Sequence, residues 1–430
     1  MITNSQILQV LKDEAVPALG CTEPVACAYA CAKCTEILGE VPDNIVVEVS
    51  GNILKNGMGV GIPGTGMTGL PIAAALGAVC GKTQYGLEVL KDVMQGDNLA
   101  KAKQMLHDNA VKIILCANAP DILYAKAVCS KNENVAVVEI QQTHINIVRT
   151  MKNNEILFEK PMLTSEEKSS VHNELTMRHI WNYINEVDVK DIDFVLKGAE
   201  MNRQISKDGL ESAYGLQIGR TLQMGLNKNK SEIDLLHSAL VMATAASDAR
   251  MDGCPKPVMT NSGSGNQGIT VYLPVLAAAD KFGSSQEQLA RALALSNLVA
   301  SHIHYFVGHL SALCGILIAG TGAACAITYL MGGDYERMVN TIKIMASNLT
   351  GIMCDGAKKG CALKVYSGVS AAVEAALLSM NGINTSNDGI VDEDIEKTIR
   401  NIGEIGSKGM NSTDKMIIDI MKNKTNVVPD

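Results

Sequence analysis

The alternation of apolar and polar residues predicts two helices at the start of the chain. Residues 4–15 read as an amphipathic helix that is ended by a proline and a glycine. A second helix is expected from Thr22, the cap candidate, to about Leu38, with a proline in its first turn and a glycine after its end.

The following segments have the patterns of strands. Residues 44–52 alternate between apolar and polar positions, and residues 111–160 contain short runs rich in β-branched residues, separated by turn signals. Nearly all of the chain after these strands reads as helical, with Ala- and Leu-rich stretches interrupted by Gly-rich loops. The fold class is therefore expected to be α+β, with a small sheet-containing part at residues 1–165 and a larger, mostly helical domain at residues 166–430. The two opening helices fit either part.

The composition supports closely packed helices. Hydrophobic residues make up 47% of the 430 positions and aromatic residues only 3%, so the core must be built from Ala, Leu, Ile, Val and Met. The uncharged run at residues 310–330 is long enough to span a bilayer, but it contains glycines and cysteines and lacks basic flanks and an aromatic belt. We expect a buried helix there and no membrane partner.

Charge and cysteine usage narrow the partners and the compartment. A net charge of −8 argues against a nucleic-acid-binding surface, which needs clustered Lys and Arg. The first residues lack the basic and apolar regions of a secretory signal, so a cytoplasmic protein is expected. In a reducing compartment the 12 cysteines are not expected to form a disulfide framework, and a subset of them is a candidate for metal binding or reactivity.

Gly59, Gly61 and Gly64 match the Gly-x-Gly-x-x-Gly pattern of dinucleotide-binding loops. Such a loop joins a strand directly to a helix, and a second strand ends in an acidic residue about 20 residues later. Neither feature is present here, so a dinucleotide site is not expected. The glycines instead allow the backbone to approach another group closely, such as the substrate.

The cysteines near the N-terminus are of two kinds. Cys27, Cys31 and Cys34 lie at helical spacing among alanines, which suits close helix packing better than a metal site. Cys21 lies at the expected start of a helix, where unpaired N–H groups and the helix dipole stabilise a thiolate. The sequence therefore predicts a lowered pKa for the Cys21 thiol and makes it a candidate for a reactive role, while a role in packing stays open.

A Gly-rich loop and a second group of cysteines are candidates for ligand binding. Free N–H groups at a helix start, together with short polar side chains, bind a carboxylate or phosphate well, although an ordinary capped loop fits the same pattern. The loop residues are Asn261, Ser262, Ser264, Asn266 and Gln267. Cys314, Cys354 and Cys361 match the spacing of neither a zinc knuckle nor a ferredoxin, so metal binding and core packing both stay open on spacing alone.

Several stretches, read together and in order, resemble the L-cysteine desulfidase family, a relative of the iron–sulfur L-serine dehydratases. The matching stretches are PALGCTEP (17–24), VSGNILKNGMGVGIPGTG (49–66), TNSGSGNQGI (260–269), HLSALCG (309–315), MCDGAKKGCALK (353–364) and GMNSTDKMIIDIM (409–421). They span the chain from end to end and are jointly specific. The helical half is also similar to the α part of bacterial serine dehydratases.

This resemblance implies a cofactor and a reaction. In the family, three cysteines hold a [4Fe–4S] cluster, one per chain, and these fall on Cys314, Cys354 and Cys361, while the proposed catalytic base falls on Cys21. The implied reaction is β-elimination of L-cysteine to pyruvate, ammonia and hydrogen sulfide, with an open iron as Lewis acid and without pyridoxal phosphate. An L-serine dehydratase with the same site and a cluster-binding sensor without activity are the alternatives.

A small amino acid is the expected partner, and the sequence is compatible with a homo-oligomer. The residues expected to orient the substrate are Asn52, Lys55, Asn261, Ser262, Ser264, Asn266, Gln267 and Lys364.

Overall fold

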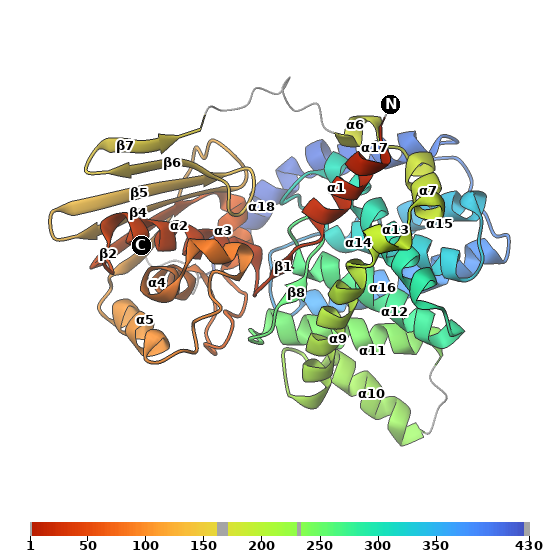
Figure 1. Ribbon diagram of the computed structural model, residues 1–430, viewed down its shortest axis with the longest axis horizontal. Helices are drawn as coiled ribbons and strands as arrows, with labels where there is room; N and C mark the ends of the chain where they lie inside the picture. Colours follow the sequence, from red (N-terminus) through yellow and green to blue (C-terminus); the bar gives the residue numbers. More distant parts are fainter. Residues whose placement is uncertain (1, 161–170, 230–233, 425–430) are drawn as a thin grey trace.

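The computed structural model describes residues 2–160, 171–229 and 234–424, which form two lobes side by side (Figure 1). One lobe contains a six-stranded sheet with helices packed against it, and the larger lobe is almost entirely helical. This confirms the expected α+β class. The expected domain boundary near residue 165 lies outside the described residues.

The sheet has the strand order β3-β2-β4-β5-β6-β7. Its strands are β2 (Asn44–Val49), β3 (Val111–Leu115), β4 (Tyr124–Lys131), β5 (Asn134–Gln141), β6 (Ile147–Lys152) and β7 (Glu155–Glu159). Neighbouring strands are antiparallel, except that β2 and β3 are parallel. The strands expected between residues 111 and 160 are therefore confirmed.

Helices cover one face of this sheet. Alternate residues of β2 and β4 face α2 (Thr22–Leu38) and α4 (Leu70–Cys80), and together they form the core of the lobe. Cys27, Cys31 and Cys34 are fully buried in this core, as their helical spacing predicted. The parallel pair β2 and β3 is joined by a crossover that contains α3 (Gly51–Gly57), α4, the short 3₁₀ helix η1 (Thr83–Glu88) and α5 (Asn98–His107).

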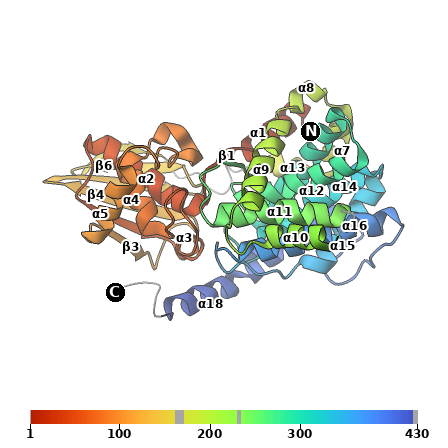
Figure 2. The same ribbon diagram turned by 90° about the horizontal axis from the view of Figure 1, so that it is seen from below.

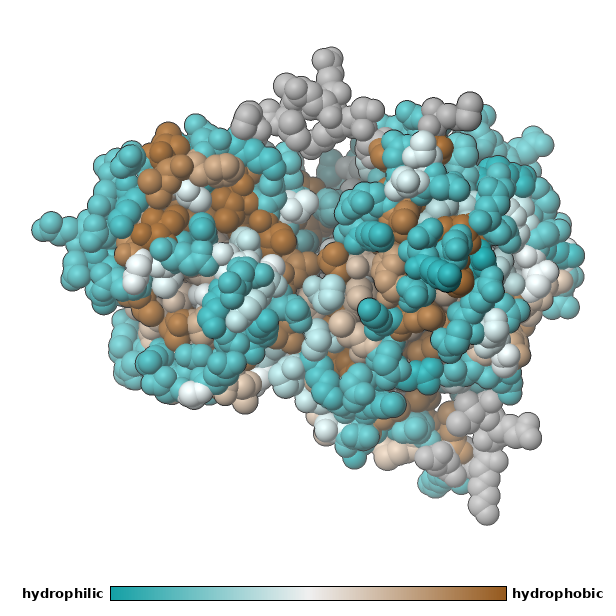
Figure 3. All heavy atoms as spheres, in the orientation of Figure 1, coloured by the Kyte–Doolittle hydropathy of each residue, from teal (hydrophilic) through white to brown (hydrophobic). Residues whose placement is uncertain are grey.

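Strand β7 is the most exposed part of the sheet. All of its residues are exposed, and Ile145, Ile147, Leu157 and Phe158 line a surface groove together with side chains of α2. In Figure 3, apolar side chains gather on the sheet lobe in the region where Figure 1 places β6 and β7.

The helical lobe is built around α14 (Gly315–Leu330), whose residues from Ile316 to Thr328 are buried. The expected buried helix within residues 310–330 is therefore present. Its other helices are α6 (Val171–Glu174), α7 (Met177–Glu186), α8 (Val189–Ile192), α9 (Val195–Glu211), α10 (Ile218–Asn229), α11 (Leu235–Met251), α12 (Gly265–Phe282), α13 (Gln286–Val307), α15 (Tyr335–Leu349), α16 (Cys361–Met380), α17 (Ile395–Glu404) and η2 (Ile405–Gly409). Among the described helices, α16 is long and apolar enough to cross a membrane, and half of its apolar stretch is buried inside the protein.

Three segments tie the lobes together. Helix α1 (Asn4–Glu14) packs its apolar face into the core of the helical lobe, although it precedes the sheet in sequence. The following strand β1 (Pro17–Ala18) pairs with β8 (Val258–Met259) of the helical lobe. Helix α18 (Asn411–Lys422) leaves the helical lobe and runs beneath the sheet lobe, where it packs against α3 (Figure 2).

Candidate active site

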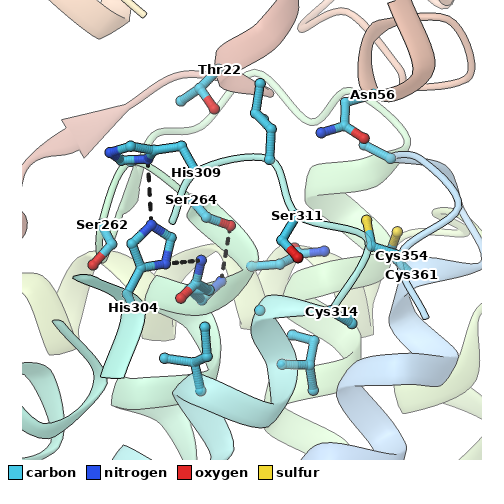
Figure 4. Close-up of a pocket in the computed structure, with 18 of the residues that line it drawn as sticks. Thr22, Asn56, Ser262, Ser264, His304, His309, Ser311, Cys314, Cys354 and Cys361 are labelled. Carbon is cyan, nitrogen blue, oxygen red and sulfur yellow. Dashed lines mark hydrogen bonds between the residues drawn. The ribbon is translucent and has the colours of Figure 1, made fainter. Parts of the chain in front are cut away.

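A cavity of about 130 Å³, whose lining includes many polar side chains, lies where the two lobes meet (Figure 4). The sheet lobe contributes the start of α2, a residue of α3 and the loop between β5 and β6. The helical lobe contributes the end of α11, the Gly-rich loop before α12, and the segments around residues 304–318 and 354–364. Its polar and sulfur-bearing lining residues are Cys21, Thr22, Glu23, Asn56, His144, Arg250, Met251, Ser262, Ser264, Asn266, Gln267, His304, His309, Ser311, Cys314, Cys354, Cys361 and Lys364.

Cys314, Cys354 and Cys361 reach this cavity from separate elements. Cys314 is the N-cap of α14, Cys354 lies in the segment before α16, and Cys361 is the first residue of α16. The thiols of Cys354 and Cys361 lie next to each other in Figure 4, and none of the three forms a disulfide. Burial, with a contribution from Cys354, raises the pKa of Cys314 to about 12, while the Lys364 ammonium acts in the opposite direction.

Cys21 also lines the cavity, but its environment differs from the expected one. It is the N-cap of α2, so the expectation that Thr22 is the cap is wrong by one residue. Its side chain makes no capping hydrogen bond. The side chain is 3% exposed, and burial raises its pKa to about 12 although Arg250 lowers it. The expected low pKa is therefore wrong, because a helix N-terminus contributes only about 0.3–1 kcal/mol and full burial shifts a pKa by several units.

The Gly-rich loop forms one wall of the cavity. Ser262, Ser264, Asn266 and Gln267 line it, and the Ser264 hydroxyl caps α12 by accepting a hydrogen bond from the Gln267 amide at 3.4 Å. Asn261 lies behind this wall and is fully buried. Its side-chain amide donates to the carbonyl of Asn297 at 3.2 Å and to the Ser301 hydroxyl at 3.2 Å. Four of the five expected loop residues thus face the cavity, and the fifth holds the loop.

Lys364 lines the cavity beside the three cysteines. Its ammonium donates to the Met353 carbonyl at 2.7 Å and pairs with Asp355. It therefore fixes the backbone next to Cys354 and also contributes a positive charge near the thiols.

Asn52 and Lys55 do not line this cavity. The Asn52 amide donates to the Leu310 carbonyl at 2.8 Å and so holds the loop that carries His309 and Ser311. The Lys55 side chain is buried and paired with Asp414 of α18, and it lines a separate cavity of about 940 Å³ on the other side of α3.

The glycines of the 59–66 loop approach the protein's own backbone. Gly59 forms a parallel bridge with Lys358, and the Gly61 amide donates to the Met251 carbonyl at 3.0 Å. A Cβ atom on Gly61 would lie 2.5 Å from the carbonyl carbon of Asp252. The predicted close approach is present, but its partners are the end of α11, the residue that follows it, and Lys358, and the glycines do not line the cavity where the substrate was expected.

Several cavity residues were missed by the sequence analysis. Burial lowers the pKa of His144 to about 4, and burial together with the His309 ring holds the pKa of His304 well below its usual range. The His304 Nε2 atom lies 3.3 Å from His309 Nδ1. The other missed residues are Glu23 as a cavity side chain, Asn56, Arg250 and Ser311. A signal was available for Arg250, because it is a charged residue near the end of an Ala-rich helix whose last turns are buried.

Comparison with known proteins shows which family the chain belongs to. Residues 84–419 match the family model described as serine dehydratase alpha chain. The chain belongs to the serine dehydratase alpha chain family. Its relatives include UPF0597 proteins that are each 44% identical to it, from Parabacteroides distasonis (99% of both chains), Phocaeicola vulgatus (97% of both) and Oleidesulfovibrio alaskensis (98% of both).

Known members of the serine dehydratase alpha chain family use an iron–sulfur cluster. The donor chemistry of this chain fits such a group, since three free thiols from three elements face one cavity and thiolates are the ligands of iron–sulfur clusters. No group of three His, Cys, Asp or Glu side chains in residues 2–160, 171–229 and 234–424 is placed to bind a single metal ion. A four-iron cluster differs in this respect, because each of its ligand sulfurs binds a different iron atom.

Proposed function

We propose that this protein is an iron–sulfur-dependent β-eliminating lyase that converts L-cysteine and water to pyruvate, ammonia and hydrogen sulfide. The observation that carries the proposal is the convergence of Cys314, Cys354 and Cys361 with Cys21 on one cavity, in a chain of the serine dehydratase alpha chain family. The free cysteines suit a reducing compartment, and we propose that the reaction takes place in the cytoplasm.

In this proposal Cys314, Cys354 and Cys361 hold a [4Fe–4S] cluster, one per chain. With three protein ligands, the bound cluster keeps one iron open and supplies a Lewis acid rather than an electron carrier. The side chain of Lys364 lies beside these thiols and partly offsets their negative charge. Neither pyridoxal phosphate nor a Schiff-base lysine is required.

The proposed base is Cys21. Elimination removes the proton from Cα, moves that electron pair into the Cα–Cβ bond and releases the β-substituent, which leaves an aminoacrylate that water converts to pyruvate and ammonia. A thiolate at Cys21 would take the proton. Because burial raises the pKa of Cys21, its thiolate is a strong base once formed, and Arg250 stabilises it.

The Gly-rich loop positions the substrate. Ser262, Ser264, Asn266 and Gln267 present hydroxyl and amide groups to the cavity at the start of α12. Asn261 and Asn52 do not line the cavity. Asn261 fixes the Gly-rich loop through a hydrogen bond, and Asn52 fixes the loop at Leu310 in the same way. Rigid polar groups of this kind hold a substrate in the geometry in which it reacts.

The second candidate is dehydration of L-serine by the same site. Serine and cysteine differ only in the oxygen or sulfur atom at Cβ, and the name of the matching family supports serine. Cysteine ranks first because the quoted motifs resemble those of the desulfidases more closely, and because a thiolate leaving group suits iron better than a hydroxyl group.

The test is an anaerobic purification with reconstituted iron and sulfide, followed by parallel pyruvate assays on L-cysteine and L-serine. Sulfide is measured in the first assay, and the Cys354→Ser variant serves as the control for cluster-dependent turnover. Pyruvate and sulfide released together from cysteine, with serine slower, support the proposal, whereas faster turnover of serine assigns a dehydratase. A protein that carries a cluster and processes neither amino acid would be a sensor, and the lyase proposal would then be wrong.

A further inference from the structure

Arg250 carries a buried positive charge that no carboxylate of the described chain neutralises. The side chain is 4% exposed and lines the active-site cavity. Its Nη1 donates to the Asn266 side-chain oxygen at 3.1 Å and to the Met251 sulfur at 3.3 Å, and its Nη2 donates to the Gly20 carbonyl at 3.1 Å. Its Nε has no hydrogen-bond partner. Buried charges are normally paired, so a guanidinium that has no carboxylate partner among the described residues and a free Nε can bind an anionic ligand in the cavity.

Glu23 carries the matching negative charge. Its side chain is 9% exposed and lines the same cavity. One carboxylate oxygen accepts a hydrogen bond from the Asn56 amide at 3.0 Å, and the other accepts from the Thr22 hydroxyl at 3.4 Å. Within the described residues it forms no ion pair, either with Arg250 or with another cationic side chain.

Both charges lie beside the proposed base. Arg250 donates to the carbonyl of Gly20, the residue before Cys21, and Glu23 lies in the first turn of α2, two residues after Cys21. The positive and the negative group border one small cavity and are not paired with each other. Together they are complementary to a ligand that carries one negative and one positive charge.

Other polar atoms at the cavity are also without partners. The side-chain oxygens of Asn56 and Gln267 and the Nε2 atom of His144 are buried and have no hydrogen-bond partner. Each of these residues lines the cavity and is more than nine-tenths buried. Buried polar groups without partners are rare in folded proteins, and several at one cavity indicate a polar ligand.

We infer that Arg250 and Glu23 form a zwitterion-binding pair, in which Arg250 binds the α-carboxylate and Glu23 binds the α-ammonium group of the substrate. The inference rests on the proposed function, because it assigns the recognition of an amino acid to that same site. It also adds selectivity: acids that lack the amine and amines that lack the carboxylate are rejected, since each leaves one buried charge unpaired.

A purely structural role for Arg250 is the competing explanation. The residue lies in the last turn of α11, where the helix carbonyls favour a positive charge. If Arg250 had only this structural role, its replacement would lower the stability of the protein, and its side chain would contact neither the carboxylate nor the ammonium group of a ligand.

The experiment measures binding to the anaerobically reconstituted protein by calorimetry. Three ligands that have no leaving group at Cβ are compared: L-alanine, propionate, which lacks the ammonium group, and ethylamine, which lacks the carboxylate. Wild-type protein is expected to bind L-alanine at least about tenfold more tightly than either truncated ligand, since each truncation removes the hydrogen bonds to one buried charged group.

Two variants should then lose complementary parts of this preference. In Arg250→Gln, affinity for L-alanine is expected to fall to the level of ethylamine, whose own affinity does not change. In Glu23→Gln, affinity for L-alanine is expected to fall to that of propionate. Arg203→Gln on α9, whose arginine pairs with Asp280 at the surface, is the control and should bind as wild type does.

The outcomes separate this inference from the proposed function. If wild-type protein binds all three ligands equally, or if Arg250→Gln weakens all three by the same factor, the pairing is wrong even where pyruvate is formed. If L-alanine is preferred and neither cysteine nor serine yields pyruvate, the zwitterion site stands and the lyase proposal fails. The wild-type comparison needs no variant, so a folding defect in Arg250→Gln does not block the test.

Discussion

Leu313 and Met353 form an isolated antiparallel β-bridge, and each of them is followed directly by a cysteine that lines the cavity. The Cys314 amide donates to the Ile352 carbonyl at 2.8 Å, and the Cys354 amide donates to the Ala312 carbonyl at 2.6 Å. Paired backbone therefore holds these two thiols in place, although 40 residues separate them in the sequence. Cys361 is fixed independently by the first turn of α16.

Replacing any of the three cysteines is expected to abolish both the cluster and the activity. Cys314→Ser, Cys354→Ser or Cys361→Ser removes a thiolate ligand, and a hydroxyl group is a poor ligand for cluster iron. Visible absorbance, iron content and pyruvate formation report the losses. Cys325→Ser, in the buried middle of α14, is the control and should keep the colour. Equal loss of colour in this control would contradict the ligand assignment.

Replacing Cys21 should separate cluster binding from catalysis. Cys21→Ser keeps the three proposed ligands, so the brown colour is expected to remain. Turnover should fall by about 10²-fold or more, because a buried serine hydroxyl is a much weaker acid than a thiol and cannot serve as the base. Unchanged kcat with full colour would exclude Cys21 as the base.

The sequence predicted the sheet well because its signals are local. The strands between residues 111 and 159 are short, rich in β-branched residues and separated by turn residues, so each is recognisable by itself. The sequence does not fix the position of α1, because the apolar face of a helix does not show which core it packs against. Its packing in the helical lobe depends on contacts with α13, which lies almost 300 residues later.

The site was predicted in part, for the same physical reason. The cysteines and the Gly-rich loop could be predicted from their residue types and from the resemblance to a family. The positions of Arg250 and Glu23 at the site could not, because they depend on two lobes meeting at one cavity. The pKa of Cys21 was misjudged because helix position can be read locally, whereas burial is a property of the whole fold.

Gly265→Ala is expected to disturb the proposed carboxylate site. A Cβ atom at this first residue of α12 would lie 2.2 Å from Nε of Arg250 and 2.6 Å from its Cζ. The guanidinium would have to move, so KM for the amino acid should rise about tenfold or more while the cluster colour remains. Gly225→Ala on α10 is the control, because its Cβ would meet no heavy atom within 4 Å. An unchanged KM in Gly265→Ala would argue against Arg250 as a substrate contact.

His144 should make the protein less stable in acid. Burial, with the neighbouring His309 opposing its protonation and Glu23 favouring it, lowers the pKa of His144 to about 4, below the usual value of 6.5. Below pH 6.5 the unfolded chain therefore binds a proton that the folded protein does not, and stability is lost as the pH falls toward 4. Between pH 7 and pH 5 the wild type should lose about 2 kcal/mol more unfolding free energy than His144→Gln.

Urea unfolding at several pH values measures this difference. The control is His107→Gln, since His107 is an exposed residue at the end of α5. It should keep the wild-type pH dependence. The same pH dependence in His144→Gln as in wild type would show that His144 is not held neutral by the fold.

The buried ion pair between Lys55 and Asp414 should stabilise the contact of α18 with the sheet lobe. The Lys55 side chain is fully buried, and Asp414 is its only ion-pair partner within the described residues. Asp414→Asn leaves a buried ammonium without a counter-charge and should lower the free energy of unfolding by about 3–5 kcal/mol. The double variant Lys55→Met/Asp414→Leu should recover most of this loss, because it removes both charges together.

This prediction also decides between two roles for Lys55. Lys408→Met breaks an exposed pair with Glu404 and should cost less than about 1 kcal/mol, which provides the control for a surface ion pair. Because Lys55 does not line the active-site cavity, KM of the double variant for the amino acid should equal that of wild type. A raised KM with unchanged urea stability would instead return Lys55 to the substrate-binding role that the sequence predicted.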